Sequence, residues 1–392
     1  MKRSTSRILT SHAGSLPRPA PLLDVNRAKM TGEGFDEKLY AERLAAAVGE
    51  ICRTQKALGI DIVNDGEFGK ASAGAIDYGP WASYAWRRLS GWDYAQPGQV
   101  AMLAGRRDRI EFADFYKELD GTGFISSNSL TPRQPVFTGP ITYVGQDAVR
   151  TDMANLKAGL AGAPAEEGFV TSVAPGSFGR RQNLYYKTDE EFLVALGEAM
   201  REEYKAIIDA GFVLQLDDPG LPSTWDFSPP ETTTAEYQKF AMLRVEALNH
   251  TLRGLPKDRI RYHICWGSWH GPHASDLPLA DIVDVMLKVH AGAFSVEAGN
   301  VRHEHEWKVW RDHKLPDGAL LMPGVVSHAT NVIEHPDLVA DRIIRFASLV
   351  GRDNVIACTD CGLGGRIHVQ LVWAKLKALV EGAAIASRAL WR

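Results

Sequence analysis

Short apolar runs alternate with longer amphipathic segments along most of this chain, and that alternation limits the folds open to it. Repeated strand–helix alternation predicts an α/β fold, a parallel sheet with helices outside it. Eight such units would close a single (β/α)8 TIM barrel, so one of nine candidate strands is extra, and we expect it to be 136–143. The candidates are 8–12, 61–65, 136–143, 170–174, 212–217, 260–265, 293–297, 319–326 and 354–358.

The rival architecture is an open, doubly wound sheet. No glycine-rich dinucleotide fingerprint follows the first strand, which weighs against that rival. The chain has 392 residues, a length that α/β barrels reach as one domain. We therefore expect residues 1–392 to form one barrel domain.

Several helices are predicted by the residues at their ends. Asp36 is a candidate N-cap, and Thr188 with Glu191 has the spacing of a capping box. Pro336 suits the first position of a helix, where its missing N–H costs nothing. The predicted ranges are 36–58, 188–210, 336–350 and 367–386.

Residues 69–134 show no barrel pattern and hold Trp81, Trp86 and Trp92 close together. We interpret this segment as an insertion over the mouth of the barrel. The alternative is a packed extension that only covers the surface. Whether the segment acts as a lid is left open.

Composition excludes several classes of function. The formal net charge is −4, so no basic surface argues for nucleic acid. No apolar run approaches membrane-spanning length, and no signal peptide is apparent. Four cysteines in so long a chain do not make a disulfide framework, which indicates reduced thiols in a cytoplasmic protein. The oligomeric state, a homo-oligomer included, is left open.

Unusual polar residues follow the predicted strands, and in a barrel functional residues lie at the carboxyl ends of strands. Each alone is a weak signal, since a carboxylate after a strand is about as often a helix cap. Their joint occurrence raises the odds of a site. In chain order they are Gly14, Ser15, Asp65, Glu67, Asp217, Asp218, His263, Cys265, Glu297, His328 and Cys361.

One subset has the composition of a zinc site. His263 and Cys265 are two positions apart on a strand and so share a face. With Glu297 and Cys361 they offer nitrogen, sulfur and oxygen ligands, a plausible zinc set. Cys358 competes with Cys361, although its apolar neighbours favour core packing.

A zinc site with two thiolates suits the binding of another thiol better than the activation of water. A coordinated thiol loses its proton near neutral pH and becomes a nucleophile. His328, after a strand, is placed to return a proton to a leaving group; a loop histidine without function is the alternative. The cluster 303–306 is also rich in ligands, but we interpret it as a solvated helix start or a layer behind the site.

The chain resembles the catalytic barrel of cobalamin-independent methionine synthase, in stretches that follow the family's order. These are Ala13-Gly14-Ser15, Asp65-Gly66-Glu67, Gln215-Leu216-Asp217-Asp218-Pro219, His263-x-Cys265, Ser295-Val296-Glu297 and Asp360-Cys361-Gly362-Leu363. The resemblance implies a (β/α)8 barrel that methylates homocysteine. It implies zinc on His263, Cys265, Glu297 and Cys361, with His328 as proton donor. It also implies that Gly14, Ser15, Glu67 and Asp217 bind the amino-acid thiol.

The folate side departs from the family. Ser223 stands where the family has an acidic residue, and Gly176 where it has a tryptophan. Both departures weigh against polyglutamyl methyltetrahydrofolate as donor. A related single-barrel branch includes epoxyalkane:coenzyme M transferase, which adds a sulfonate thiol to an epoxide. Arg180 and Arg181 could serve such an acceptor, whereas the acidic Glu67 and Asp217 argue against it. A third hypothesis is a non-catalytic barrel that binds zinc or a thiol.

Overall fold

Eight parallel strands form the centre of the molecule. The structure is a computed structural model that describes residues 1–72, 79–95, 107–121, 135–178, 183–268 and 271–392. The strands pair in the order β1-β10-β9-β8-β7-β6-β5-β2. They are β1 (Leu9–Thr10), β2 (Ile62–Val63), β5 (Glu167–Val173), β6 (Val213–Asp217), β7 (Ile260–Ile264), β8 (Ala293–Val296), β9 (Leu320–Val326) and β10 (Ile356–Thr359).

The two end strands, β1 and β2, approach each other through Asp61. The backbone N–H of Thr10 donates to Asp61 Oδ2 at 2.9 Å. In return the Asp61 N–H donates to the Thr10 carbonyl at 3.2 Å. The sheet is thereby nearly closed, and the predicted single (β/α)8 barrel is confirmed.

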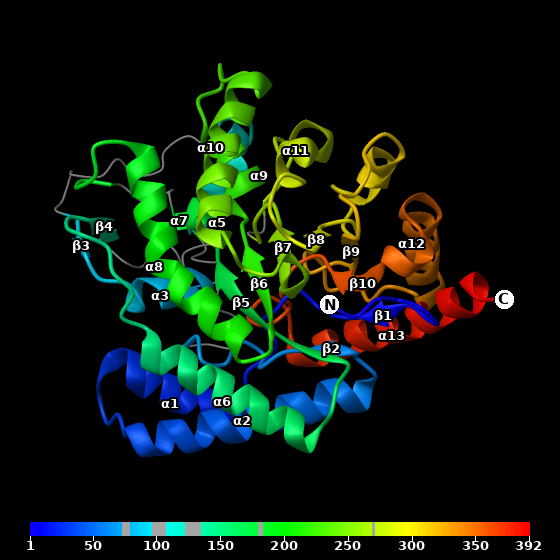
Figure 1. Cartoon of the computed structure of the whole chain (residues 1–392), viewed down its shortest axis with the longest axis horizontal. Coiled ribbons are helices and arrows are strands. Elements are labelled where there is room, and N and C mark those ends of the chain that lie inside the picture. The colour runs from blue at the N-terminus through cyan, green and yellow to red at the C-terminus, as the bar shows by residue number, and fades with distance from the viewer. Residues whose placement is uncertain (73–78, 96–106, 122–134, 179–182, 269–270) are drawn as a thin grey trace.

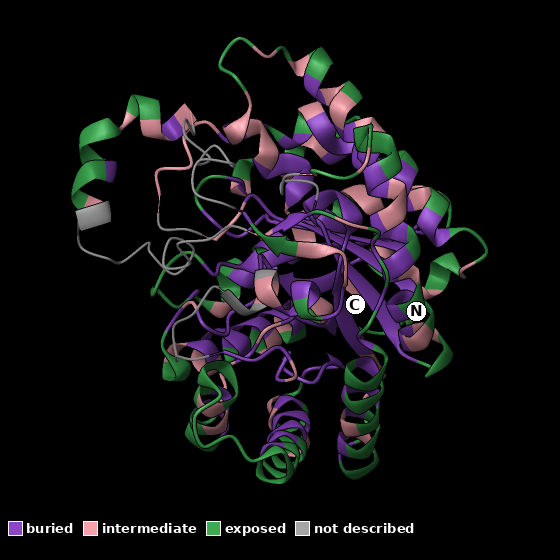
Figure 2. Ribbon diagram, turned by 90° about the vertical axis from the view of Figure 1, so that its left-hand side faces the viewer, coloured by how far each residue is buried: buried purple, intermediate pink, exposed green. Residues whose placement is uncertain are grey.

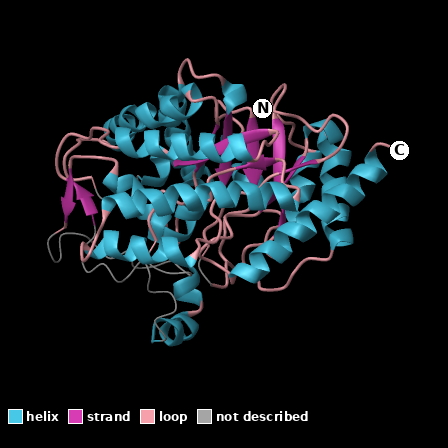
Figure 3. Ribbon diagram, turned by 90° about the horizontal axis from the view of Figure 1, so that it is seen from below, coloured by secondary structure: helices cyan, strands magenta, loops and turns pink. Residues whose placement is uncertain are grey.

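Helices surround the strands on the outside (Figure 1). Buried strands lie at the centre and helices with exposed outer faces lie outside them (Figure 2), and from below helices cross in front of the strands (Figure 3). The α-helices are α1 (Ala20–Thr31), α2 (Glu37–Leu58), α3 (Gly79–Arg87), α4 (Arg107–Glu111), α5 (Ala113–Gly121), α6 (Gln146–Gly162), α7 (Pro175–Phe178), α8 (Asp189–Asp209), α9 (Gly220–Phe227), α10 (Thr234–Leu252), α11 (Leu279–Met286), α12 (Pro336–Val350) and α13 (Val369–Leu390). The described residues also form the 3-10 helices η2 (Lys257–Arg259), η3 (Glu304–Arg311) and η4 (Arg352–Asn354).

Most of the helix ends follow the sequence signals. The Asp36 carboxylate accepts the Leu39 N–H at 3.0 Å and starts α2. At α8 the predicted capping box is half present: the Thr188 hydroxyl caps Glu191, but the Glu191 carboxylate accepts the N–H of Lys187, one residue before the cap. Helix α13 extends to Leu390, beyond the predicted end.

The apolar core has two parts, as expected for a barrel. A large cluster fills the space between strands and helices. A smaller one fills the barrel interior with Leu9, Ala13, Ile62, Phe169, Val213, Ala293, Leu320, Met322, Ile356 and Cys358. The interior is therefore packed, and a ligand has to bind at the mouth. None of the described helices combines the length and the apolar character needed to cross a bilayer.

The run 136–143 is the extra strand, as predicted. Its first part forms β4 (Pro135–Phe137), which pairs antiparallel with β3 (Trp92–Tyr94) outside the barrel. Figure 1 shows this pair at the edge of the molecule, away from the eight strands. The described parts of the insertion 69–134 hold α3, β3, α4 and α5.

Candidate active site at the carboxyl ends of the strands

The predicted site residues meet at one end of the barrel because neighbouring strands bring them into register. In the parallel ladder Asp217 of β6 pairs with His263 of β7, and His263 pairs with Ser295 of β8. Glu297 follows β8 directly, and Cys361 follows β10. All of these residues lie at or just after the carboxyl ends of strands β6 to β10, and all are buried.

Three of the four predicted zinc ligands form one cluster. The ligand atoms of His263, Cys265 and Cys361 all lie within 4.8 Å of one another. The two Sγ atoms are 3.7 Å apart and share a hydrogen bond. This sharing lowers the pKa of the Cys361 thiol well below its usual range. The deprotonated form of Cys361 is therefore favoured.

The donor atoms fit a zinc ion. The Nδ1 atom of His263 is held by the Ser295 hydroxyl at 3.0 Å, while its Nε2 atom is buried without a hydrogen-bond partner among the described residues. Second-layer contacts of this kind fix the ring of a metal-binding histidine. Two sulfurs each about 2.3 Å from a tetrahedral zinc would lie about 3.8 Å apart, close to the observed separation.

Glu297 belongs to an adjacent cluster. A ligand oxygen of Glu297 lies within 4.8 Å of ligand atoms of His328 and Asp360. Its Oε1 accepts the backbone N–H of Trp266 at 2.9 Å, and its Oε2 accepts the Asn300 amide at 2.7 Å. Burial raises the pKa of Glu297 well above its usual range. The structure thus places three predicted ligands together and the fourth beside them.

Asp360 ties the ends of β8 and β10 together. Its Oδ1 atom accepts the backbone N–H groups of Ala298 and Gly299 at 2.7 and 2.8 Å. Its Oδ2 atom accepts the Asn300 amide at 3.0 Å. Burial raises the pKa of Asp360 to about 6. These bonds hold in place the segment that directly follows Glu297.

His328 lies after β9 and faces the same space. The side chain is buried, and its Nδ1 atom has no hydrogen-bond partner among the described residues. Burial lowers the pKa of His328 to about 4, although the nearby Cys361 acts in the opposite direction. The resting imidazole is therefore neutral at pH 7.

The other two cysteines lie elsewhere. Cys358 is fully buried in the barrel interior, and burial raises its pKa to about 11. Cys52 is buried on α2, where burial raises its pKa to about 12. All four thiols are free. Core packing of Cys358, the favoured interpretation of its sequence context, agrees with this position.

The loop after β1 and the loop after β2 meet closely. A Cβ atom on Gly14, whose φ is +134°, would lie 2.2 Å from Glu67 Oε1, so only glycine fits there. Glu67 itself has a φ of +60°, an uncommon conformation for a residue with a side chain. The Ser15 hydroxyl donates to the Gly364 carbonyl at 3.2 Å. Backbone strain of this kind gathers at binding sites.

Asp217 is held from two sides. Its Oδ1 atom accepts the Gln215 amide at 2.6 Å, and its Oδ2 atom accepts the indole N–H of Trp81 at 3.3 Å. Burial raises the pKa of Asp217 to about 6. Because Trp81 belongs to α3, the first part of the insertion reaches the mouth of the barrel, as predicted.

The two positions that depart from the folate side of the family are both buried. A Cβ atom on Gly176 would lie 3.2 Å from the Arg244 side chain, so a larger residue there would require Arg244 to shift. The Ser223 hydroxyl donates to the Pro219 carbonyl. Arg180 and Arg181, named for a sulfonate, lie outside the described residues.

The cluster 303–306 lies partly behind the site. His303 is buried, so a fully solvated helix start is wrong for this residue. Its ring stacks on Trp266 at 4.0 Å, and its two nitrogens contact Glu306 at 2.8 Å and Asp276 at 3.2 Å. The backbone N–H of Trp266 binds Glu297, so His303 supports the site from behind. This agrees with the second of the two interpretations of residues 303–306, a layer behind the site.

We expect the free energy of unfolding to fall as pH rises, because of His303. Burial opposes its charge, but Asp276 and Glu306 outweigh burial and raise the pKa of His303 to about 10. The folded protein then holds a proton that the unfolded chain releases near pH 6.5, so the stabilisation is complete below 6.5 and lost as pH rises to about 10. Urea unfolding of the wild type should show this decline, and His303→Gln should flatten it.

The exposed neighbour His305 offers the matched control for that measurement. His305→Gln should keep the wild-type slope of unfolding free energy against pH. Equal slopes for the wild type and His303→Gln would contradict the assigned proton.

Several residues of the site escaped the sequence reasoning. Lys70 comes from a turn, where no period predicts direction, and Trp81 comes from α3, a helix that the sequence reasoning did not predict. Asn300 and the role of Asp360 also went unpredicted. Their signal is their place within three residues of Glu297 or Cys361, which a search for polar residues around each ligand would have found.

Comparisons with known proteins agree with this geometry. No family model matches the chain. The chain is 25% identical over 96% of its length to the 2-hydroxypropyl-CoM lyase of Xanthobacter autotrophicus, and covers 94% of that protein. It is 24% identical over 98% of its length to a methionine synthase of Thermococcus kodakarensis, of which it also covers 94%.

Among solved structures, a B12-independent methionine synthase from Shewanella sp. W3-18-1 in complex with selenomethionine is similar in fold. Its TM-score is 0.70 at 20% identity, with 98% of this chain and 99% of that chain covered. The resemblance to cobalamin-independent methionine synthases and to their single-barrel branch is therefore confirmed.

Proposed function

We propose that this chain is a zinc enzyme that transfers an alkyl group onto the sulfur of a small thiol. The observation that carries the proposal is the cluster of His263, Cys265 and Cys361 at the mouth of the barrel. The names of the relatives, methionine synthase and 2-hydroxypropyl-CoM lyase, both describe chemistry at a thiol. A reducing cytoplasm suits a protein whose cysteines are all free.

Each nearby side chain has a proposed role in that reaction. His263, Cys265 and Cys361 would hold zinc, with Glu297 beside them for the fourth place or for exchange with the substrate. Bound zinc would supply deprotonation of the substrate thiol near neutral pH. Ser295 orients His263 through Nδ1 and leaves Nε2 for the metal.

His328 is proposed as the proton donor. It is buried beside Cys361, in a region that excludes water. A neutral imidazole must first gain a proton, and negative charge that arrives with a substrate thiolate favours this gain. His328 would then deliver the proton to the leaving group of the alkyl donor.

The acceptor is proposed to bind with its tail between the loops of Gly14, Ser15 and Glu67 on one side and Asp217 on the other. Two acceptors are proposed: homocysteine, which the methionine synthases suggest, and coenzyme M, which the 2-hydroxypropyl-CoM lyase suggests. The replaced folate positions, Gly176 and Ser223, argue for an alkyl donor other than polyglutamyl methyltetrahydrofolate.

Metal analysis of the purified protein tests the proposal. We expect about one zinc per chain, and loss of that zinc in Cys265→Ser and in Cys361→Ser, since each removes a sulfur ligand. Cys358→Ser is the matched control, because its sulfur lies in the barrel interior, and should keep the zinc. Zinc retained after loss of both Cys265 and Cys361 would refute the site.

A purely structural zinc is separated from a catalytic one by ligand exchange. Structural sites are closed by four protein ligands, whereas catalytic sites keep a place for substrate. X-ray absorption should show the number of zinc-bound sulfurs rise from two to three when a thiol is added. An unchanged coordination sphere would favour the non-catalytic barrel.

A further inference from the structure

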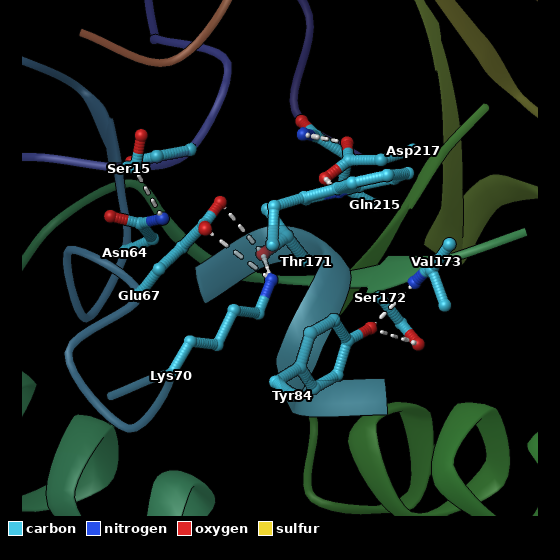
Figure 4. Close-up of polar contacts among 12 residues, drawn as sticks. Ser15, Asn64, Glu67, Lys70, Tyr84, Thr171, Ser172, Val173, Gln215 and Asp217 are labelled. Atoms are coloured by element: carbon cyan, nitrogen blue, oxygen red, sulfur yellow. Dashed lines mark hydrogen bonds and ion pairs between the residues drawn. The ribbon is translucent and has the colours of Figure 1, made fainter. Parts of the chain in front are cut away.

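The carboxylate of Glu67 already faces an ammonium group of the chain itself. The Nζ atom of Lys70 lies 3.4 Å from Glu67 Oε2. It donates to the Thr171 hydroxyl at 2.6 Å, and that hydroxyl donates to Glu67 Oε1 at 2.9 Å. Figure 4 shows the closed triangle of Glu67, Lys70 and Thr171. Lys70 is 5% exposed and Glu67 6% exposed, so water hardly reaches the pair.

The position of Lys70 is fixed by its surroundings. Its Nζ atom lies over the ring of Tyr84, 4.4 Å from the centroid, where the ring face attracts a cation. The Tyr84 hydroxyl in turn accepts the backbone N–H of Val173 at 2.7 Å, which anchors the ring to β5. Arg18 donates to the backbone carbonyls of both Glu67 and Lys70 at 2.7 Å. The ammonium group is therefore built into the pocket.

The second carboxylate is also engaged. Gln215 and Trp81 each donate to one oxygen of Asp217. Gln215 is itself held by Arg261, whose Nε atom donates to Gln215 Oε1 at 2.6 Å. Each of the four carboxylate oxygens of Glu67 and Asp217 thus has a partner within the chain, and one of these partners, Lys70, is a cation.

We infer that Lys70 occupies the place of a substrate ammonium group and makes the pocket select thiols that carry an acidic group but no ammonium group. A second ammonium would have to enter a buried site beside Lys70, and like charges so placed repel strongly. The ammonium group of Lys70 would instead form a charge-assisted hydrogen bond with an acidic tail. This inference rests on the proposed function, because it assumes that a thiol binds here.

A matched pair of thiols tests it: homocysteine and 4-mercaptobutyrate, which is homocysteine without its amino group. Titration calorimetry of the zinc-loaded protein should show 4-mercaptobutyrate binding at least about tenfold more tightly. Lys70→Met frees Glu67 and should shift the ratio of the two dissociation constants by more than about tenfold toward homocysteine, whereas Lys70→Arg should keep the wild-type preference. The same titration with 2-mercaptoethanesulfonate tests whether the site accepts a sulfonate in place of the ligand's carboxylate.

The possible outcomes distinguish a failure of this inference from a failure of the proposed function. Tighter binding of homocysteine by the wild type, or an unchanged ratio in a folded Lys70→Met variant, would overturn the role of Lys70 and leave thiol alkylation standing. If Lys70→Met does not fold, the ratio of the two dissociation constants in the wild type is sufficient to decide the role of Lys70. In the cobalt-substituted protein, thiol binding should add a sulfur-to-cobalt absorption band. Absence of that band with every thiol, neutral 2-mercaptoethanol included, would overturn the proposed function itself.

Discussion

His328→Asn should lower kcat for thiol alkylation by about 100- to 10,000-fold, the usual contribution of a positioned acid–base group. The variant keeps a polar side chain of similar size but cannot carry a transferable proton. Because the ring of His328 is not needed for the sulfur cluster, zinc content should stay at the wild-type level. The rate is measured with the donor that the wild type uses, a methylated tetrahydrofolate or an epoxyalkane.

His335, exposed at the start of α12, supplies the control. His335→Asn keeps a good N-cap residue and should leave kcat unchanged. A His328→Asn enzyme that turns over at the wild-type rate would remove His328 from the reaction and leave the proton donor to be sought elsewhere.

Lys375→Met should lower the free energy of unfolding by about 3–5 kcal/mol, the usual effect of breaking a buried ion pair. Lys375 is fully buried on α13, and its ammonium group lies 2.9 and 3.0 Å from the two oxygens of Glu334. Without it, the Glu334 charge stays buried and unpaired. Glu334 also accepts the backbone N–H of Ser327 at 2.9 Å, so the loop that carries His328 should loosen as well.

A second lysine of α13 serves as the matched control for Lys375. Lys377 pairs with Glu381 at 3.7 Å, and both side chains are about half exposed or more. Lys377→Met should cost less than about 1 kcal/mol, as surface ion pairs do. Urea unfolding of both variants gives the difference, and equal losses would show that burial does not govern the strength of the Lys375 pair.

Much of the barrel was predictable because its signals are local. The Asp36 cap and Pro336 mark helix starts, and the structure places α2 and α12 there. The run 136–143 was expected to lie outside the barrel, and β4 does. The half-formed capping box of α8 shows the limit: spacing predicts that Glu191 bonds the backbone, but not which N–H it takes.

The site was predictable where its residues lie on strands, because a strand determines the direction of each side chain. His263 and Cys265 share a strand face, and the closed sheet brings Cys361 to them. Loop residues were different, because no period governs their side chains. Lys70 lies only three residues beyond Glu67, yet only the folded turn shows that its ammonium group returns to that carboxylate. The sequence therefore pointed to the two carboxylates, Glu67 and Asp217, but not to the lysine that forms an ion pair with one of them.

The contact of Trp81 with Asp217 has a consequence for how such a protein changes over generations. The indole comes from an inserted segment, while the sulfur cluster and Asp217 come from the barrel. A barrel of this kind supports many chemistries by variation of its loops. A change in the insertion would alter the wall beside Asp217 while the strands that carry the sulfur cluster stay the same. Because Tyr84 and Trp86 of the same insertion are part of the core, such a change would also alter folding stability.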